Sequence, residues 1–152
     1  MEIKIRNSEK EDIEIITDFQ FDMAFETEDL KLDREILRAG VETVIINEDV
    51  ARSYIAEVDA IPAGMLMITY EWSDWRNGWV WWIQSVSVKP GFRSLGIYRK
   101  LYEHVKEIVL KSQNVRGIRL YVDKRNVRAQ QVYEKLGMNC DHYTTYEWMK
   151  NS

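Results

Sequence analysis

The stretch Ser85 to Leu101, "SVSVKPGFRSLGIYRKL", takes the chain from a strand pattern through Lys-Pro-Gly directly into a helix pattern. Backbone N–H groups in the first turn of a helix lack partners within the helix, and the aligned peptide dipoles place about +0.5 charge there. Such a helix start favours an anion, and a diphosphate is a natural occupant. Arg93 adds a fixed charge, and Gly96 would let a phosphate approach the backbone closely. Taken alone, the pattern equally fits a glycine that accommodates packing and an arginine on the surface.

The strand before this stretch is predicted over residues 79–88 and follows an aromatic segment, "EWSDWRNGWVWW", at residues 71–82. Its Asn77-Gly78 pair is typical of a tight hairpin, since both residues tolerate a positive φ. Strand alternation places Trp82 on the same face as Gln84. The segment is therefore predicted to be chiefly a packed hairpin, with Trp82 near the mouth of any ligand groove.

Hydrophobic periodicity along the rest of the chain predicts a single domain over residues 1–152 of the α/β (α+β) class. The expected elements are strands at 1–6, 53–58, 63–72, 79–88 and 118–122, a strand pair within 138–149, and helices near 13–23, 33–46, 95–108 and 129–136. Their order, β-α-α-β-β-β-α-β-α-β-β, predicts a mixed sheet of six to seven strands flanked by about four helices.

Composition narrows the classes of function. A net charge of −4 argues against a general nucleic-acid surface and favours a cationic partner. The amino terminus lacks the apolar block needed for secretion or membrane spanning, so we expect a cytoplasmic protein. The lone Cys140 and two distant histidines favour neither a disulfide nor a metal site.

A second motif lies at residues 122–138, "VDKRNVRAQQVYEKLGM", where Asn126, Ala129, Tyr133 and Gly137 fall on one helical face. An amphipathic helix with Gly137 as its C-cap would explain this segment alone. Paired with Arg93-x-x-Gly96, however, the motif resembles the acetyl-CoA-binding core of the GNAT superfamily of N-acetyltransferases. The resemblance covers nearly the whole chain, including the "YIAEVDAIPAGML" hairpin at residues 54–66.

The resemblance implies a twisted sheet with a V-shaped gap between the strand ending at Val88 and the strand 118–122, and acetyl-CoA as the cofactor. It assigns residues to three parts of that cofactor: Val86, Ser87 and Val88 to the pantetheine arm through their backbone; Arg93, Ser94, Leu95, Gly96, Ile97 and Tyr98 to the diphosphate; Asn126 and Ala129 to the cofactor arm. Tyr133 matches the position that often protonates the departing thiolate, a role that suits the ordinary tyrosine pKa of about 10. Tyr98 departs from the motif, which usually has glycine or alanine there.

The resemblance further implies direct attack by a primary amine of a small molecule or peptide. Many relatives place a glutamate base at the position of Gln84, so the base has to lie elsewhere, and Glu71 is the favoured candidate. A solvated carboxylate at a strand end is the simpler interpretation of Glu71.

Other residues are predicted to meet the acceptor. Glu26 and Glu28 would attract a cationic amine, although acidic residues near helix starts also serve as caps. Trp72 and Trp82, with Gln84, would shape the acceptor mouth. A noncatalytic module that binds CoA or a protein partner stays open as the alternative, and aromatic residues near 143–148 are compatible with a homodimer edge.

Overall fold

The structure is a computed structural model, and it describes residues 1–150. The chain forms two compact units, Met1–Arg119 and Leu120–Ser152, of which the first holds the whole sheet. That the chain acts as a single domain stays a prediction.

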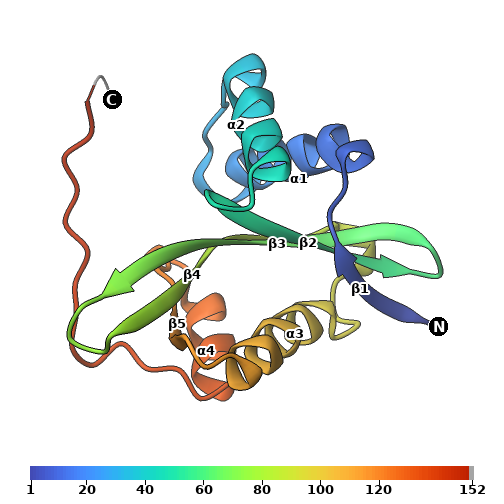
Figure 1. The fold of residues 1–152 in the computed structure, drawn as a ribbon. Helices are drawn as coiled ribbons and strands as arrows, with labels where there is room; N and C mark the ends of the chain where they lie inside the picture. Colours follow the sequence, from blue (N-terminus) through green and yellow to red (C-terminus); the bar gives the residue numbers. More distant parts are fainter. Residues whose placement is uncertain (151–152) are drawn as a thin grey trace. The chain divides into compact units, whose positions relative to one another are not determined.

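Five strands form one sheet in the order β1-β2-β3-β4-β5 (Figure 1). They are β1 (Ile3–Asn7), β2 (Ala51–Val58), β3 (Ile61–Ser73), β4 (Gly78–Val88) and β5 (Val115–Arg119). The first four pair antiparallel in sequence order, and β5 joins β4 in parallel. The sheet is mixed, as predicted.

The predicted strand number was wrong for the described residues, because five strands form where six to seven were expected. Residues 138–149 contain no strand, since a strand needs a neighbouring backbone and none pairs with this segment. The predicted strand 118–122 forms earlier, as β5.

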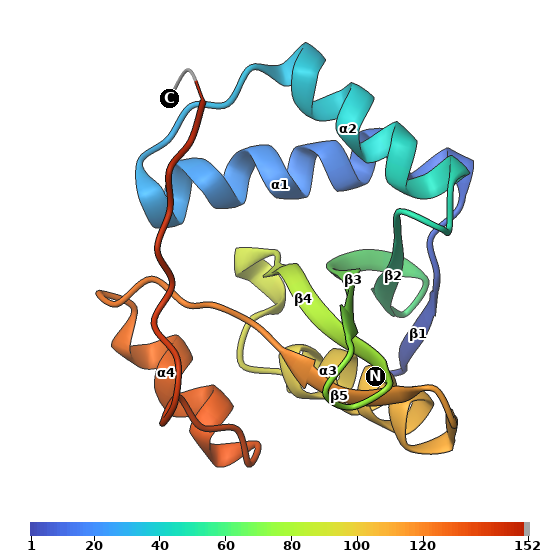
Figure 2. The same cartoon turned by 60° about the vertical axis from the view of Figure 1, so that its left-hand side comes forward.

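Helices cover both faces of the sheet. The helices α1 (Ile13–Glu28) and α2 (Arg34–Ile46) pack against each other over one face (Figure 2), and α3 (Ile97–Lys111) covers the opposite face. The core beneath α1 and α2 consists of Ile13, Ile16, Phe19, Val41, Ala51, Ile55, Met65 and Met67. Asp33 caps α2 because its Oδ1 accepts from the backbone N–H groups of Glu35 and Ile36, at 3.0 and 3.1 Å.

A glycine at position 78 is required by the strand next to the hairpin. A Cβ built on Gly78 would lie 2.7 Å from the Arg116 side chain and 2.9 Å from the Asn114 carbonyl oxygen. Of the predicted Asn-Gly pair, Asn77 alone takes a positive φ, 48°. The hairpin forms as predicted, but its glycine serves the close approach of the segment that leads into β5.

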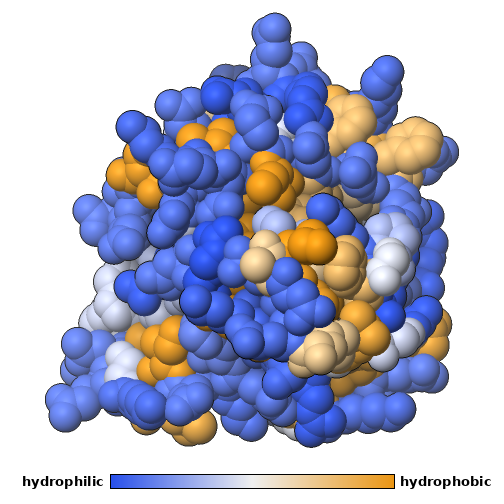
Figure 3. Space-filling view, turned by 90° about the vertical axis from the view of Figure 1, so that its right-hand side faces the viewer, coloured by the Kyte–Doolittle hydropathy of each residue, from blue (hydrophilic) through white to orange (hydrophobic). Residues whose placement is uncertain are grey.

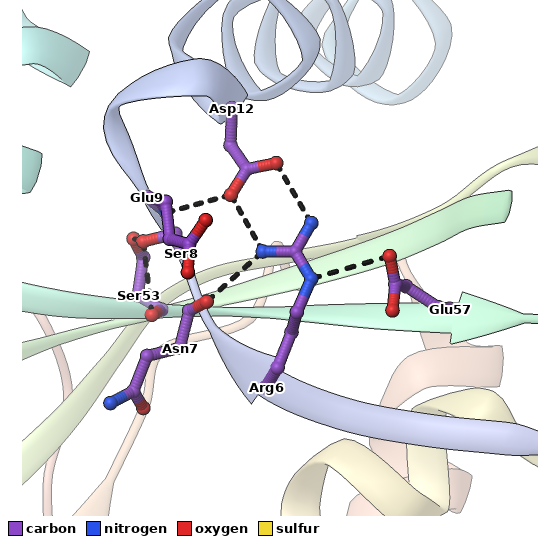
Figure 4. Close-up of polar contacts among 7 residues, drawn as sticks. All are labelled: Arg6, Asn7, Ser8, Glu9, Asp12, Ser53 and Glu57. Carbon is purple, nitrogen blue, oxygen red and sulfur yellow. Dashed lines mark hydrogen bonds and ion pairs between the residues drawn. The ribbon is translucent and has the colours of Figure 1, made fainter. Parts of the chain in front are cut away.

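Arg6 ties β1 to the start of α1 (Figure 4). Its Nη1 and Nη2 donate to the two carboxylate oxygens of Asp12 at 2.7 and 2.9 Å, and its Nε lies 3.3 Å from Glu57 on β2. Burial raises the pKa of Asp12, but the hydrogen bonds from Arg6 and from the Glu9 N–H outweigh it and hold that pKa below its usual value. The buried carboxylate therefore stays ionised and joins two elements.

The second unit contains α4 (Val127–Lys135). The Asn126 side chain caps its start by accepting from the Ala129 N–H at 3.1 Å. The Gly137 N–H donates to the Glu134 carbonyl, and the Met138 N–H to the Tyr133 carbonyl, both at 3.0 Å. Leu136 is the C-cap residue, and Gly137 follows it with a φ of 93°, so the predicted glycine ends the helix one residue beyond the predicted cap position.

The surface is mixed in character. On the face that Figure 3 draws, apolar groups are interspersed with hydrophilic side chains. No helix within residues 1–150 is long and apolar enough to cross a membrane.

Candidate active site

The strand β4 outruns its parallel neighbour. Pairing with β5 ends at Trp82↔Arg119, whereas pairing with β3 continues to Gly64↔Val88. From Ile83 to Val88, therefore, no strand within residues 1–150 pairs with this edge of β4. Val86, Ser87 and Val88 lie on this edge, where an extended ligand would find strand-like backbone groups.

A β-bulge interrupts the β3–β4 ladder at the point where this edge begins. Met67 faces Ser85 and Ile68 faces Ile83, so Gln84 has no residue opposite it on β3. Gln20 of α1 donates to the Ser85 Oγ at 2.6 Å and fixes the strand beyond the bulge. Bulges redirect side chains, and this one changes the face assignment that simple alternation gives.

The connection from β4 to α3 has the geometry of an anion site. Ser94 and Gly96 take left-handed conformations, with φ of 68° and 80°, and Gly96 is the N-cap residue of α3. A Cβ built on Gly96 would meet nothing within 4 Å. Leu95 is partly exposed and Ile97 is buried. The helix therefore begins at a glycine, which has no side chain of its own to cap it.

Arg93 lies at the same connection, and its guanidinium is held on two sides. Nε donates to the carbonyl oxygen of Val88 at 3.1 Å, while Nη1 and Nη2 donate to the carboxylate of Glu26 at 2.6 and 2.9 Å. These hydrogen bonds lower the pKa of Glu26. The structure thus joins a residue predicted for the cofactor to one predicted for the acceptor.

A polar cluster spans three strands on the face that carries α1 and α2. Its members are Thr69, Glu71, Trp82, Gln84 and Arg119. The Trp82 indole donates to Glu71 Oε1 at 2.7 Å, and Arg119 Nη1 donates to both Glu71 oxygens at 2.9 Å. The hydrogen bond from Trp82 and the charge of Arg119 lower the pKa of Glu71. Glu71 is therefore an ionised carboxylate at neutral pH.

Gln84 belongs to this cluster through Thr69, whose hydroxyl donates to the Gln84 Oε1 at 3.2 Å. Trp82 faces Thr69 across the ladder, so the predicted neighbours Glu71, Trp82 and Gln84 do come together. Trp72 does not join them. It pairs with Trp79 on the opposite face, where the two rings meet edge to face at 5.1 Å.

The two tryptophans of β4 that precede Trp82 differ in burial. Trp81 is buried, whereas Trp79 is 40% exposed. Glu28 ends α1 and is exposed, two residues beyond the Glu26 that pairs with Arg93.

The motif residues of the second unit all lie on α4 or at its start. Tyr133 is 8% exposed, Ala129 lies partly buried in the first turn, and the Asn126 oxygen serves the cap. One helix thus presents the three predicted residues at the predicted spacing.

Sequence reasoning missed Arg119 and Thr69. Arg119 is the last residue of β5, but the strand was predicted three residues late, which concealed its register with Trp82. Thr69 carried no chemical signal in the sequence.

Comparisons with known proteins identify the family of this chain. The sequence profile of the Acetyltransferase (GNAT) family matches residues 11–138. A possible acetyltransferase from Clostridium difficile 630 has a crystal structure that matches with a TM-score of 0.92 and 38% identity, covering 99% of each chain. No curated protein sequence matches the chain significantly.

More distant structures share the fold. AAC(6')-Iy, solved with the bisubstrate analogue CoA-S-monomethyl-acetylneamine, matches with a TM-score of 0.81, 16% identity and 99% of each chain. A ribosomal-protein-alanine N-acetyltransferase from Brucella melitensis biovar Abortus 2308 matches with a TM-score of 0.77 and 13% identity, covering 98% of this chain and 100% of that one. Taken together with the family match over residues 11–138, the 38% identity shows that this chain belongs to the GNAT family and is an acetyltransferase.

Proposed function

We propose that this acetyltransferase moves an acetyl group from acetyl-CoA to a primary amine of a small molecule or peptide, without a covalent enzyme intermediate. The observation that carries the proposal is the edge of β4 from Ser85 to Val88, which no strand within residues 1–150 extends and which leads directly into the start of α3 beside Arg93. When bound, acetyl-CoA supplies an activated acetyl group as a thioester.

The residues of this connection fit that ligand. The backbone of Val86, Ser87 and Val88 would hold the pantetheine arm as an added strand would be held. Arg93 and the amino-terminal end of α3 would hold the diphosphate. The open space at Gly96 fits a close approach of phosphate to backbone.

Chemistry at the thioester needs a nucleophile and a proton for the leaving sulfur. The neutral amine attacks the carbonyl carbon, the carbon–sulfur bond breaks, and the amine releases its extra proton to solvent. We propose Tyr133 as the donor to the departing thiolate, from its place in the Asn126-Ala129-Tyr133 motif. Asn126 and Ala129 would contact the cofactor arm.

Glu71 has the chemistry of an ammonium-binding group. Its lowered pKa makes it a poor proton acceptor at neutral pH, because a base works best with a pKa near the working pH. Because Arg119 already donates to both Glu71 oxygens, this carboxylate would recognise a protonated amine by sharing its charge between Arg119 and the amine, beside the Trp82 ring. This assignment favours binding over the base role predicted from the sequence.

The function is tested by following CoA release from acetyl-CoA with a thiol reagent across a panel of amines. The panel contains an alkylamine, an aminoglycoside and a peptide with a free amino terminus, and a tertiary amine serves as the control. We expect CoA release with at least one primary amine and none with the tertiary amine. CoA binding without turnover on any amine would favour the noncatalytic module.

A further inference from the structure

The Arg93–Glu26 pair joins two segments that the proposed function uses for different ligands. Glu26 lies in the last turn of α1, and Arg93 lies in the connection between β4 and α3. Both Nη atoms of Arg93 are directed at the Glu26 carboxylate, at 2.6 and 2.9 Å, and Nε is directed at the Val88 carbonyl oxygen. A bidentate arrangement of this kind is the one in which a guanidinium also binds phosphate.

We propose that Glu26 occupies the diphosphate-binding face of Arg93 when no cofactor is bound, and that the diphosphate displaces it. The inference rests on the proposed function, which places the diphosphate at Arg93. Phosphate oxygens and the Glu26 carboxylate require the same two Nη groups, so the two anions compete. Binding of CoA therefore releases a negative charge at the end of α1.

The released Glu26 carboxylate lines a groove whose other two charged lining residues have opposite charges. The groove has a volume of about 420 Å³ and is lined by Phe21, Asp22, Phe25, Glu26 and Lys31. While Arg93 neutralises Glu26, the charges of Asp22 and Lys31 cancel. Once the diphosphate has displaced Glu26 from Arg93, the residues that line the groove carry one net negative charge. The Phe25 ring beside them is 57% exposed, whereas the Arg34 guanidinium already lies 5.8 Å from the centroid of the Phe21 ring.

The release of Glu26 predicts which class of ligand the groove binds, and it predicts that this binding is coupled to the binding of CoA. A cation on an apolar body fits a groove that has aromatic walls and a net negative charge. Since Glu26 contributes fully only when the cofactor holds Arg93, the two ligands favour each other's binding, and the coupling is reciprocal. Both partners of the pair are close to half exposed, so the effect is expected to be at most about fivefold.

Calorimetry on Glu26→Gln measures the competition directly. We expect the variant to bind CoA two- to fivefold more tightly than the wild type. Pantetheine, which lacks the diphosphate, should bind equally to both proteins. Glu107→Gln is the matched control, because it also removes one carboxylate from an exposed 2.9 Å ion pair, with Lys111, in the last turns of α3. Its CoA affinity should stay unchanged.

The same titrations with 2-phenylethylamine measure the coupling, and neutral 2-phenylethanol is the matched ligand control. In the wild type, CoA should tighten binding of the amine two- to fivefold and leave the alcohol unaffected. In Glu26→Gln this gain should disappear. An amine affinity that does not respond to CoA in the wild type would overturn the coupling.

Arg93→Gln separates this inference from the function on which it rests. If the wild type fails to bind CoA, the proposed function falls and this inference falls with it. If the wild type binds CoA and Arg93→Gln weakens that binding, the proposed cofactor site stands. In that case, Glu26 is rejected as a competitor if Glu26→Gln binds CoA no more tightly than the wild type. It is also rejected if Glu26→Gln tightens the binding of pantetheine as much as that of CoA. The gain should also vanish in the double variant Glu26→Gln/Arg93→Gln.

Discussion

The proposed departure of the thiol depends on one group, the hydroxyl of Tyr133. Its ring is 8% exposed, so Tyr133→Phe keeps the apolar packing and removes one oxygen. We expect kcat to fall roughly 100-fold, the usual order for loss of a general acid, with the CoA affinity changed less than twofold. Steady-state kinetics measures kcat, and calorimetry measures the affinity for CoA. Equal turnover in the two proteins would exclude Tyr133 from catalysis.

Glu71 permits a similar test among the side chains of the polar cluster. With its pKa already lowered by Trp82 and Arg119, Glu71→Gln should raise KM for the amine about five- to tenfold and leave the shape of the kcat–pH profile unchanged. A base would behave differently. A kcat loss on the order of 100-fold, with recovery at alkaline pH, would restore Glu71 to the base role.

Between elements, the contact that joins β1, β2 and α1 is the Arg6–Asp12 pair. The Asp12 side chain is 5% exposed, so Asp12→Asn leaves the Arg6 charge partly buried without its carboxylate. We expect the free energy of unfolding at pH 7 to fall by about 2–3 kcal/mol, measured by urea denaturation.

The pH dependence of this loss has a defined sign. The pKa of Asp12 is lowered in the folded protein, so its contribution is complete above the ordinary aspartate pKa of about 3.9 and is lost as the pH falls through the folded value. The difference in the free energy of unfolding between the wild type and Asp12→Asn should therefore decrease below about pH 4. A gap that is constant with pH would contradict the ionic origin.

At the scale of the whole molecule, the carboxyl-terminal segment, residues 143–149, exposes large apolar side chains that a partner could cover. Tyr143, Tyr146, Trp148 and Met149 are 62–94% exposed, in a stretch rich in strand-forming residues that contains no strand. In the first unit, β5 is an edge strand that pairs with β4 alone among residues 1–150. We expect a second copy of the chain to cover the exposed side chains of this segment.

Light scattering after gel filtration tests this expectation. The wild type should be a dimer at about 50 µM, and Tyr146→Ser/Trp148→Ser should be a folded monomer with an unchanged circular dichroism spectrum. A monomeric wild type would contradict the expectation.

The sequence by itself determined the features that depend on neighbours along the chain. The helix predicted at 33–46 is α2 within one residue, and the strand predicted at 79–88 is β4. Gly137 ends α4 as expected. Periodicity, capping chemistry and left-handed glycine are properties of short segments, and they do not require knowledge of what packs against them.

The tertiary structure alone decided which distant residues meet. Glu26 reaches Arg93 across 67 positions, and Arg119 reaches Glu71 across 48. The bulge at Gln84 and the early end of the β4–β5 ladder likewise follow from how neighbouring strands align. Register and ion pairing between remote segments depend on the packing of the whole sheet, because the local preferences of each segment are compatible with several alignments.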